Sequence, residues 1–375
     1  MTHWAVRLPD RMASRAVLVG TATHVSPSDL TPMPQATGSV REVAAALTGP
    51  AGALHPSGVR CVFDPRSRDE VLDAVTAACT APGTDLLLFS FSGHGLIGEG
   101  GRLCLALTRS VDRESEAART GLPADDVLRL LGASTARHKV AVLDCCYSGL
   151  ALDTAATRGV HLLTATDARH KARYEPGERV TGFTRELLRL LGEGVPDGGE
   201  LLDLGTVHRQ LAVMLPSTAV RADAPLDHRY PAPRQRAVDG SADLALARNP
   251  AFGRGTTRAG LRSRAHFADR VLQLSRPDDD APFGRPDRAL QAVRLFAAIT
   301  ADATASCGPT DPDTLDYARA HATAVALSGD PAGAVRLLET MLAAPPPPGA
   351  PPAPEAALAE TRKARDHWAR RTAAG

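Results

Sequence analysis

Two runs of almost uninterrupted apolar residues constrain the fold of this chain more than any other feature. They are DLLLFSFSG at residues 85–93 and KVAVLDCC at residues 139–146. A short apolar run that lacks alternation with polar residues is typical of a strand buried on both faces. Such strands lie in the middle of parallel sheets covered by helices. We therefore expect these two segments to be the central strands of one sheet.

Segments of helical periodicity separate these two runs from further strand-like segments. Shorter apolar runs predict strands at residues 15–21, 58–64 and 159–166. Amphipathic segments predict helices at residues 39–49, 67–83, 123–134 and 183–194. After an N-terminal tail of residues 1–13, this alternation predicts an α/β fold over residues 14–252. In that fold a mostly parallel central sheet is flanked by helices on both faces.

The C-terminal third of the chain has a different character. Residues 253–288 hold clustered arginines followed by Pro, Gly and acidic residues, which predicts a linker with one short helix. The arginines of this cluster form either a solvated face of the linker or a binding patch; they are Arg254, Arg258, Arg262 and Arg264. Residues 289–371 show helical periodicity with breaks at Gly and Pro, and the proline-rich segment 345–354 predicts a stiff connector.

Residues 310–343 carry a sequence that resembles a tetratricopeptide (TPR) repeat of bacterial proteins. The segment reads TDPDTLDYARAHATAVALSGDPAGAVRLLETMLA, and part of its pattern returns about 43 residues later. The resemblance implies a small all-α module of TPR type over residues 289–371. Modules of this class bind other proteins, so we expect a protein partner here. The alternative is that the helices only pack on the neighbouring domain.

Composition excludes several classes of partner. The chain has 43 Lys and Arg against 42 Asp and Glu, so we expect no nucleic-acid partner. No apolar run approaches the roughly 20 residues of a membrane span, so we expect no membrane partner. The N-terminal residues lack the apolar core of a signal peptide, which favours a cytoplasmic protein.

The six cysteines show no spacing that would build a metal site. They contain no CxxC pair and no Cys/His zinc pattern, and the chain has no GxxxxGK[ST] phosphate loop; they are Cys61, Cys79, Cys104, Cys145, Cys146 and Cys307. We therefore expect reduced thiols, no metal and no cofactor, and at least one of the thiols is available as a nucleophile.

A histidine and a cysteine follow the two central runs at matching positions. The first run ends in Ser92, Gly93 and His94, and the second ends in Asp144, Cys145 and Cys146. The carboxyl ends of parallel strands meet at one edge of the sheet, where ligands and catalytic groups collect. An imidazole can donate a proton to a leaving amine, and a thiol becomes a nucleophile beside a base or a positive charge. The pattern therefore predicts nucleophilic catalysis at this edge.

These two blocks resemble the caspase-like cysteine peptidases, a group that includes the metacaspases. FSFSGHG is similar to the histidine block of this family, and VLDCCYSG is similar to the cysteine block, with His94 and Cys146 separated by 52 residues. TGFTRELLRLLGEG and PRQRAVDGSADLALARNPAF are similar to further segments of the family. The resemblance covers residues 14–252 and implies a caspase-like fold with a peptidase dyad.

The resemblance also implies roles for individual residues. It places Cys146 as the nucleophile, His94 as its partner, and the backbone N–H groups of Gly95 and Cys146 as the oxyanion site. Asp144 would lie at the floor of the substrate pocket and pair with a lysine or arginine that precedes the scissile bond, and Ser92 would help to bind the substrate. Cys145 would be a buried filler thiol or a redox-sensitive neighbour of Cys146.

The sequence departs from the family pattern at two places. Tyr147 replaces the histidine that commonly follows the nucleophile, and an acidic residue expected near Ser39 is missing. Asp29 is a possible substitute for that carboxylate in substrate binding; the alternative is that it is a turn or cap residue.

Two charged segments are candidates for flexible or processed regions. Residues 108–126 lack apolar periodicity and predict a flexible or cleavable loop. Residues 165–182 follow the fifth predicted strand, where caspase-like enzymes hold substrate or are processed. The basic residues Arg169, Lys171 and Arg173 in this second segment would suit a peptidase that cuts itself.

Together these features predict a cytoplasmic cysteine endopeptidase that acts on a protein or peptide substrate without a cofactor. The helical module would let a partner protein direct or release the peptidase, as in bacterial defence or programmed-death systems that the combination resembles. Two alternatives stay open. One is a catalytically silent scaffold of caspase fold, and the other is an acyl-transfer enzyme, such as a transpeptidase or ligase, that uses the same dyad.

Overall fold

A computed structural model describes residues 6–172, 177–216, 230–238, 243–276, 284–346, 348 and 352–374 of the chain. The chain divides into two compact units. The first comprises Met1–Gly194 and Gly198–Pro250, and the second comprises Val195–Asp197 and Ala251–Gly375. The division therefore falls close to residue 250.

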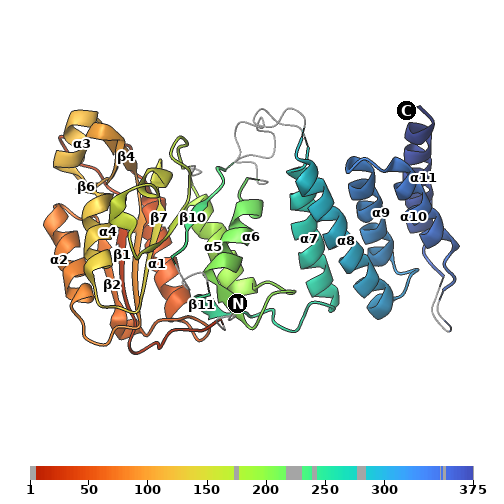
Figure 1. Ribbon diagram of the computed structural model, residues 1–375, viewed down its shortest axis with the longest axis horizontal. Coiled ribbons are helices and arrows are strands. Elements are labelled where there is room, and N and C mark those ends of the chain that lie inside the picture. Colours follow the sequence, from red (N-terminus) through yellow and green to blue (C-terminus); the bar gives the residue numbers. More distant parts are fainter. Residues whose placement is uncertain are drawn as a thin grey trace. The chain divides into compact units, whose positions relative to one another are not determined.

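The described residues of the first unit build a six-stranded central sheet (Figure 1). Its strand order is β10-β8-β7-β3-β1-β2, and every neighbouring pair is parallel except β10 with β8. The strands are β1 (Arg15–Gly20), β2 (Val59–Phe63), β3 (Leu86–Ser92), β7 (His138–Asp144), β8 (His161–Thr164) and β10 (Arg234–Arg236). The mostly parallel α/β sheet expected from the sequence is confirmed, with β3 and β7 at its centre.

Helices cover both faces of this sheet because successive side chains of each strand point to opposite sides. Val17, Phe89 and Leu143 pack in one core with residues of α2 (Arg68–Cys79) and α4 (Ala124–Ala133). On the other face, Leu18 and Val142 line a small pocket together with residues of α1 (Pro34–Thr48) and α5 (Gly182–Glu193). The near-continuous apolar runs are thus explained by burial on two sides.

The pairing of β3 with β7 aligns the ends of the two strands. Ser92 is the register partner of Asp144, and the backbone N–H of Gly93 donates to the Asp144 carbonyl at 3.3 Å. His94 and Cys146 each lie two residues beyond this last pair. Both therefore leave the sheet at the same carboxyl edge.

The segment 108–126 differs from the flexible or cleavable loop that its charge predicted. It contains α3 (Glu114–Thr120) and β6 (Leu122–Pro123), and β6 completes a small antiparallel sheet with β4 (Gly95–Gly98) and β5 (Arg102–Leu105). Ala117 is buried with Leu96, Cys104 and Ala106. The Arg68 guanidinium donates to the carbonyl oxygens of Ala118 and Arg119 at 2.9 and 3.1 Å. Several buried residues and a distant arginine order this charged segment; the buried residues include Ser110, Val111, Ala117 and Leu122.

Three further elements belong to the first unit. They are α6 (Leu204–Met214) and the antiparallel pair of β9 (Leu201–Asp203) with β11 (Ala245–Arg248). Asp203 caps α6, since its carboxylate accepts hydrogen bonds from the backbone N–H and the hydroxyl of Thr206 at 2.7 and 2.6 Å.

The second unit is helical, and each of its helices packs against the next one along the chain. Its helices are α7 (Arg258–Gln273), α8 (Pro286–Cys307), α9 (Pro312–Leu327), α10 (Pro331–Ala343) and α11 (Glu355–Ala374). Ala322, Ala334, Leu338 and Trp368 form a buried cluster from α9, α10 and α11. The proline-rich segment predicted as a stiff connector lies partly outside the described residues.

The arginine cluster of residues 254–264 belongs to this helical unit, where Arg254, Arg258 and Arg262 are exposed to solvent while most of the cluster forms ion pairs. Arg258 pairs with Asp311 and with Asp313 at 2.8 Å each, and Arg262 pairs with Asp313 at 3.0 Å. Arg264 pairs with Asp302 at 2.7 Å. These ion pairs join α7 to α8 and to the start of α9, so the segment expected to be a linker with one short helix holds a 16-residue helix instead.

No helix within the described parts of the chain combines the length and the apolar character that a membrane crossing requires.

Candidate active site

His94 lies just beyond β3 and is held by the segment that connects β1 to α1. Its Nε2 lies 2.8 Å from the carbonyl oxygen of Thr31. Because a carbonyl can only accept a hydrogen bond, Nε2 carries the hydrogen in this arrangement. The ring of His24, from the same connecting segment, lies 5.3 Å from the His94 ring with an interplanar angle of 52°. One segment thus contacts the imidazole of His94 in two ways.

His24 is an electrically neutral neighbour at physiological pH. Burial, and after it the proximity of His94, lower the pKa of His24 to about 4. The backbone around it is fixed by Asp64, whose Oδ1 accepts hydrogen bonds from the N–H groups of Ala22 and Thr23 at 2.7 and 2.8 Å. Asp64 itself adopts a left-handed conformation with φ of 48°, which is uncommon for a residue other than glycine.

Cys146 lies just beyond β7 and is half-buried. Its Sγ is 3.8 Å from the carbonyl oxygen of Ala172. Burial raises the pKa of the Cys146 thiol, while the contacts with Ala172, Lys171 and the backbone of Gly95 act in the opposite direction. The thiol is therefore enclosed and has a positive side chain and a backbone donor nearby.

Gly95 joins the histidine segment to the cysteine segment. A Cβ atom at Gly95 would lie 2.0 Å from the carbonyl oxygen of Cys146 and 3.2 Å from the Sγ of Cys145. No real side chain tolerates the first of these distances, so glycine is required where the two segments touch. The structure thus brings the chain that follows His94 into contact with the chain that carries Cys146, as the register of β3 and β7 predicts.

Cys145 differs from its neighbour in environment. Its side chain is 0% exposed and belongs to the main core of the first unit. Burial raises the pKa of Cys145 well above its usual value. It has the properties of the buried filler thiol that was one of the two expectations, and both cysteines are free thiols.

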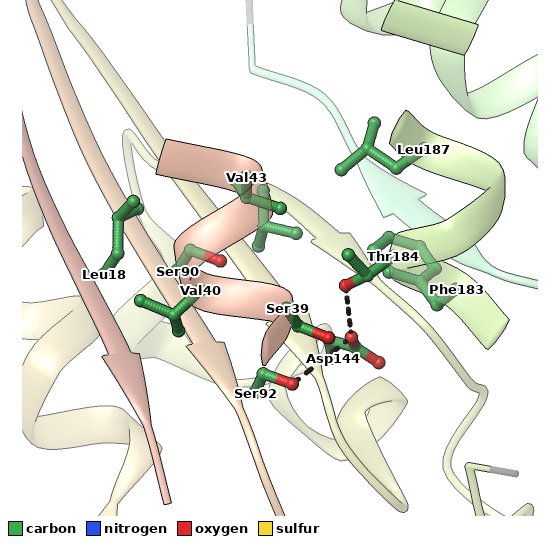
Figure 2. A pocket seen from close by; sticks show the side chains of 11 residues that line it. Leu18, Ser39, Val40, Val43, Ser90, Ser92, Asp144, Phe183, Thr184 and Leu187 are labelled. Atoms are coloured by element: carbon green, nitrogen blue, oxygen red, sulfur yellow. Dashed lines mark hydrogen bonds between the residues drawn. The ribbon is translucent and has the colours of Figure 1, made fainter. Parts of the chain in front are cut away.

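Asp144 ends β7 and is buried beneath hydroxyl groups (Figure 2). Its Oδ2 accepts hydrogen bonds from Thr181 Oγ1 at 2.5 Å, Thr184 Oγ1 at 2.8 Å and Ser92 Oγ at 3.5 Å. Its Oδ1 is buried and accepts no hydrogen bond from the described residues. Burial raises the pKa of Asp144 to about 6, although the three hydroxyls favour the charged form.

Asp144 lines two small pockets. The first lies between the sheet, α1 and α5, and Figure 2 shows most of its walls. The second is lined by Asp144 together with Ala165, Ala172, Phe183, Leu215, Tyr230 and Pro231. Ala172 therefore touches both the Cys146 thiol and the second pocket. A mostly apolar pocket with a single carboxylate thus opens beside the thiol.

The structure places the remaining expected site residues differently. Ser92 lies against Asp144, as a residue that supports the carboxylate. Asp29 is exposed, accepts a hydrogen bond from the backbone N–H of Asp112 at 3.3 Å, and lines neither pocket. It is not brought to Asp144 and behaves as a loop residue. Ser39 lines the first pocket, and its hydroxyl accepts from the Thr181 N–H at 3.1 Å, so no second carboxylate lines either pocket.

Three residues of the site were not predicted from the sequence, namely Thr181, Thr184 and His24. Thr181 is the N-cap of α5 and accepts a hydrogen bond from the Thr184 backbone N–H at 3.0 Å. The capping role was readable from the sequence, because threonine before an amphipathic run is a helix-start signal. The contact of both hydroxyls with Asp144 was not readable, since about 40 residues separate the partners.

The segment that follows β8 is tied to the cysteine segment. The Ser148 backbone N–H donates to Thr166 Oγ1 at 3.1 Å, and the Tyr147 N–H donates to the carbonyl of His170 at 3.0 Å. Asp167 accepts from the Arg169 and His170 N–H groups at 2.9 and 3.0 Å. This segment therefore holds Ala172 over the thiol. Arg173, one of the basic residues expected to suit self-cleavage, lies outside the described residues.

Comparison with known proteins does not assign the chain to a family. No protein-family model matches the chain, and no curated protein matches it. Across the described ranges no three His, Cys, Asp or Glu side chains form a group that could hold a metal ion. A functional proposal therefore rests on the site and on the motifs that build it.

Proposed function

We propose that the chain is a cysteine endopeptidase of caspase or metacaspase type that cleaves after lysine or arginine. One observation carries the proposal: the carbonyl oxygen of Ala172 lies 3.8 Å from the Cys146 thiol, and Ala172 also lines the pocket that Asp144 lines. A substrate with its carbonyl at Cys146 would have a pocket for its side chain within reach. A buried carboxylate in a small, mostly apolar pocket favours a cationic partner, and a lysine or arginine side chain would enter by displacing the pocket walls.

The dyad performs acyl transfer in this proposal. Nε2 of His94 stays bound to Thr31, so Nδ1 exchanges a proton with Cys146 and with the substrate. The Cys146 thiolate attacks the carbonyl carbon of the peptide, the carbon–nitrogen bond breaks, and His94 gives its proton to the leaving amine. Water then attacks the thioester, loses a proton to His94, and releases the carboxylic acid and the thiol.

Backbone groups at the junction of the two segments stabilise the oxyanion. The N–H of Gly95 lies close enough to the Cys146 sulfur to act against the raised pKa of its thiol, and in this proposal it is the first oxyanion donor. The N–H of Cys146 is the second donor. Preorganised backbone donors of this kind are worth about 3 to 4 kcal/mol of transition-state stabilisation.

We also propose that the second unit is a TPR-like module through which a partner protein directs or releases the peptidase in the cytoplasm. The repeat-like sequence of residues 310–343 and the successive packing of α8 to α11 support this assignment. The combination with a caspase-like peptidase resembles bacterial defence systems.

The test is cleavage of a peptide library that varies the residue before the scissile bond. Purified full-length protein would be compared with its Cys146→Ala and Cys145→Ala variants. We expect cleavage after lysine or arginine that is lost in Cys146→Ala and retained in Cys145→Ala. Cleavage that persists in Cys146→Ala would exclude the assigned nucleophile.

The enclosed state of the thiol favours a second candidate, a scaffold of the same fold without catalysis. Cys146 is half-buried, burial raises the pKa of its thiol, and the Ala172 carbonyl covers it. Alkylation by iodoacetamide separates the two candidates. A peptidase nucleophile should react at pH 7 faster than the other thiols, and its rate should fall in a His94→Ala variant, whereas a scaffold thiol should be inert in both proteins.

A further inference from the structure

The two oxygen atoms of the Asp144 carboxylate are not equivalent. Oδ2 receives the hydroxyls of Thr181, Thr184 and, at longer distance, Ser92. Oδ1 receives none from the described residues and is buried. Figure 2 shows two of these hydrogen bonds, from Thr184 and Ser92, converging on one oxygen of Asp144 while the other oxygen points away from them. A cation that enters the pocket therefore meets a carboxylate with one oxygen already occupied.

This asymmetry distinguishes the two basic side chains that the pocket could accept. A carboxylate oxygen has two lone pairs, and the two short threonine bonds fill those of Oδ2. The guanidinium of arginine binds a carboxylate best as a planar fork that uses both oxygens. The ammonium of lysine is a compact charge that needs only one of them.

The remaining walls of the pocket add to this difference. Apart from Asp144 and Tyr230, the second pocket is lined by Ala165, Ala172, Phe183, Leu215 and Pro231. A guanidinium bound to Oδ1 alone would leave four of its five N–H groups against these walls or the pocket mouth, whereas an ammonium would leave two of three. Buried donors without partners weaken binding.

We propose that Thr181 and Thr184 make this pocket select lysine over arginine at the residue that precedes the scissile bond. The inference rests on the proposed function for the identity of the pocket, and it adds a selection that the carboxylate alone would not make. Both threonines are specificity-determining residues that act through Asp144.

Thr184 gives the cleaner test of the two. The Thr184 hydroxyl donates to Asp144, whereas the Thr181 hydroxyl also accepts from the Thr184 backbone and caps α5. Thr184→Val therefore frees a lone pair on Oδ2 and leaves the helix cap in place. Thr206→Val is the matched control, because it removes a similar Thr–Asp contact at the start of α6 in the same unit.

The experiment uses two peptides that differ only in lysine or arginine before the scissile bond. Their dissociation constants are measured on full-length Cys146→Ala protein, with and without Thr184→Val or Thr206→Val, at pH 8. We expect the lysine peptide to bind about tenfold more tightly, which corresponds to about 1.4 kcal/mol. Thr184→Val should reduce this ratio to about threefold or less by improving arginine binding, and Thr206→Val should leave it unchanged.

Hydrolysis of the same peptides by protein with Cys146 intact separates this inference from the proposed function. Tighter lysine binding without hydrolysis would remove the peptidase assignment and retain the selective pocket. Hydrolysis with equal or better arginine binding would overturn the selection and retain the peptidase. Failure of both peptides to bind, or an unchanged ratio in Thr184→Val, would also overturn the selection.

Discussion

The ring of His24, which belongs to the segment that links β1 to α1, lies 5.3 Å from the ring of His94, and His94 also contacts Thr31 of the same segment. His94 is thereby held between an aromatic neighbour and the Thr31 carbonyl. Because the pKa of His24 is lowered to about 4, the neighbour carries no charge that would oppose a proton on His94 near pH 7. His24 has the geometry of a positioning residue.

We predict that His24→Ala lowers kcat about tenfold with little change in KM, because the imidazole of His94 gains freedom to leave its reactive orientation. His24→Phe should keep most of the activity, since a phenyl ring preserves the contact. His55→Ala serves as the matched control, because His55 lies before β2 at the amino edge of the sheet. Equal loss in the Ala and Phe variants would show that the nitrogens of His24 are needed, contrary to the positioning role.

A second prediction concerns Gly95. Gly95→Ala should abolish peptide cleavage, because the new Cβ would lie 2.0 Å from the Cys146 carbonyl and would push the two segments apart. Gly192→Ala is the control, since Gly192 lies within α5 and a Cβ there meets nothing within 4 Å. That control should stabilise the protein by about 0.5 to 1 kcal/mol and keep activity. Thermal unfolding followed by circular dichroism, with activity measured in parallel, checks both; an active Gly95→Ala variant would contradict the close approach.

Asp144 leads to a prediction about stability and pH. Its folded pKa of about 6 lies above the unfolded value of 3.8, so the folded state binds the proton more tightly. Its contribution to stability is therefore fully present below about pH 4 and is lost as the pH rises through 6, by about 3 kcal/mol in total. Asp144→Asn lacks this dependence.

The free energy of unfolding of Asp144→Asn, relative to the native protein, should therefore increase between pH 4 and pH 8. Denaturant titrations at a series of pH values measure this difference, and other titrating groups cancel in it. Cleavage after lysine should be lost in the same variant at every pH. A stability difference that stays constant with pH would contradict the raised pKa of the buried carboxyl.

His161 should show the opposite dependence on pH. Burial, and then the proximity of His208, lower the pKa of His161 to about 4, below its unfolded value of 6.5. Its contribution to stability is present above pH 6.5 and is lost as the pH falls to 4, by about 3 kcal/mol. In a His161→Phe variant the fall in unfolding free energy from pH 7.5 to pH 4 should be smaller by that amount. The same fall in unfolding free energy between pH 7.5 and pH 4 in both proteins would contradict the lowered pKa of His161.

The sequence predicted the central sheet well because its signal is local. The apolar runs that became β3 and β7 need no knowledge of distant residues, and their shared carboxyl edge follows from parallel pairing. The same logic placed His94 and Cys146 on neighbouring segments. The predicted strand boundaries also agree closely with the observed ones, since the strand predicted at residues 139–146 is observed as His138–Asp144.

The features that were missed depend on partners far away in the chain. In the sequence the arginines of α7 are typical of a solvated linker. The structure pairs them with Asp302, Asp311 and Asp313, which lie far away in the chain. The charged segment 108–126 is ordered by Arg68, and Asp144 meets its threonine hydroxyls only through the packing of α5 on the sheet. Composition within a window carries no information about such contacts.

Because the pKa of Asp144 is raised, binding of a cation to the pocket is coupled to the release of protons. Below about pH 6 Asp144 of the free protein is mostly neutral, yet an ammonium group can form a charge pair only with its ionised form. Each binding event at pH 5 therefore expels close to one proton into the buffer, and at pH 8 it expels none. The heat of binding at low pH will then vary with the ionisation enthalpy of the buffer. The strength with which the pocket binds a cation will therefore depend on pH.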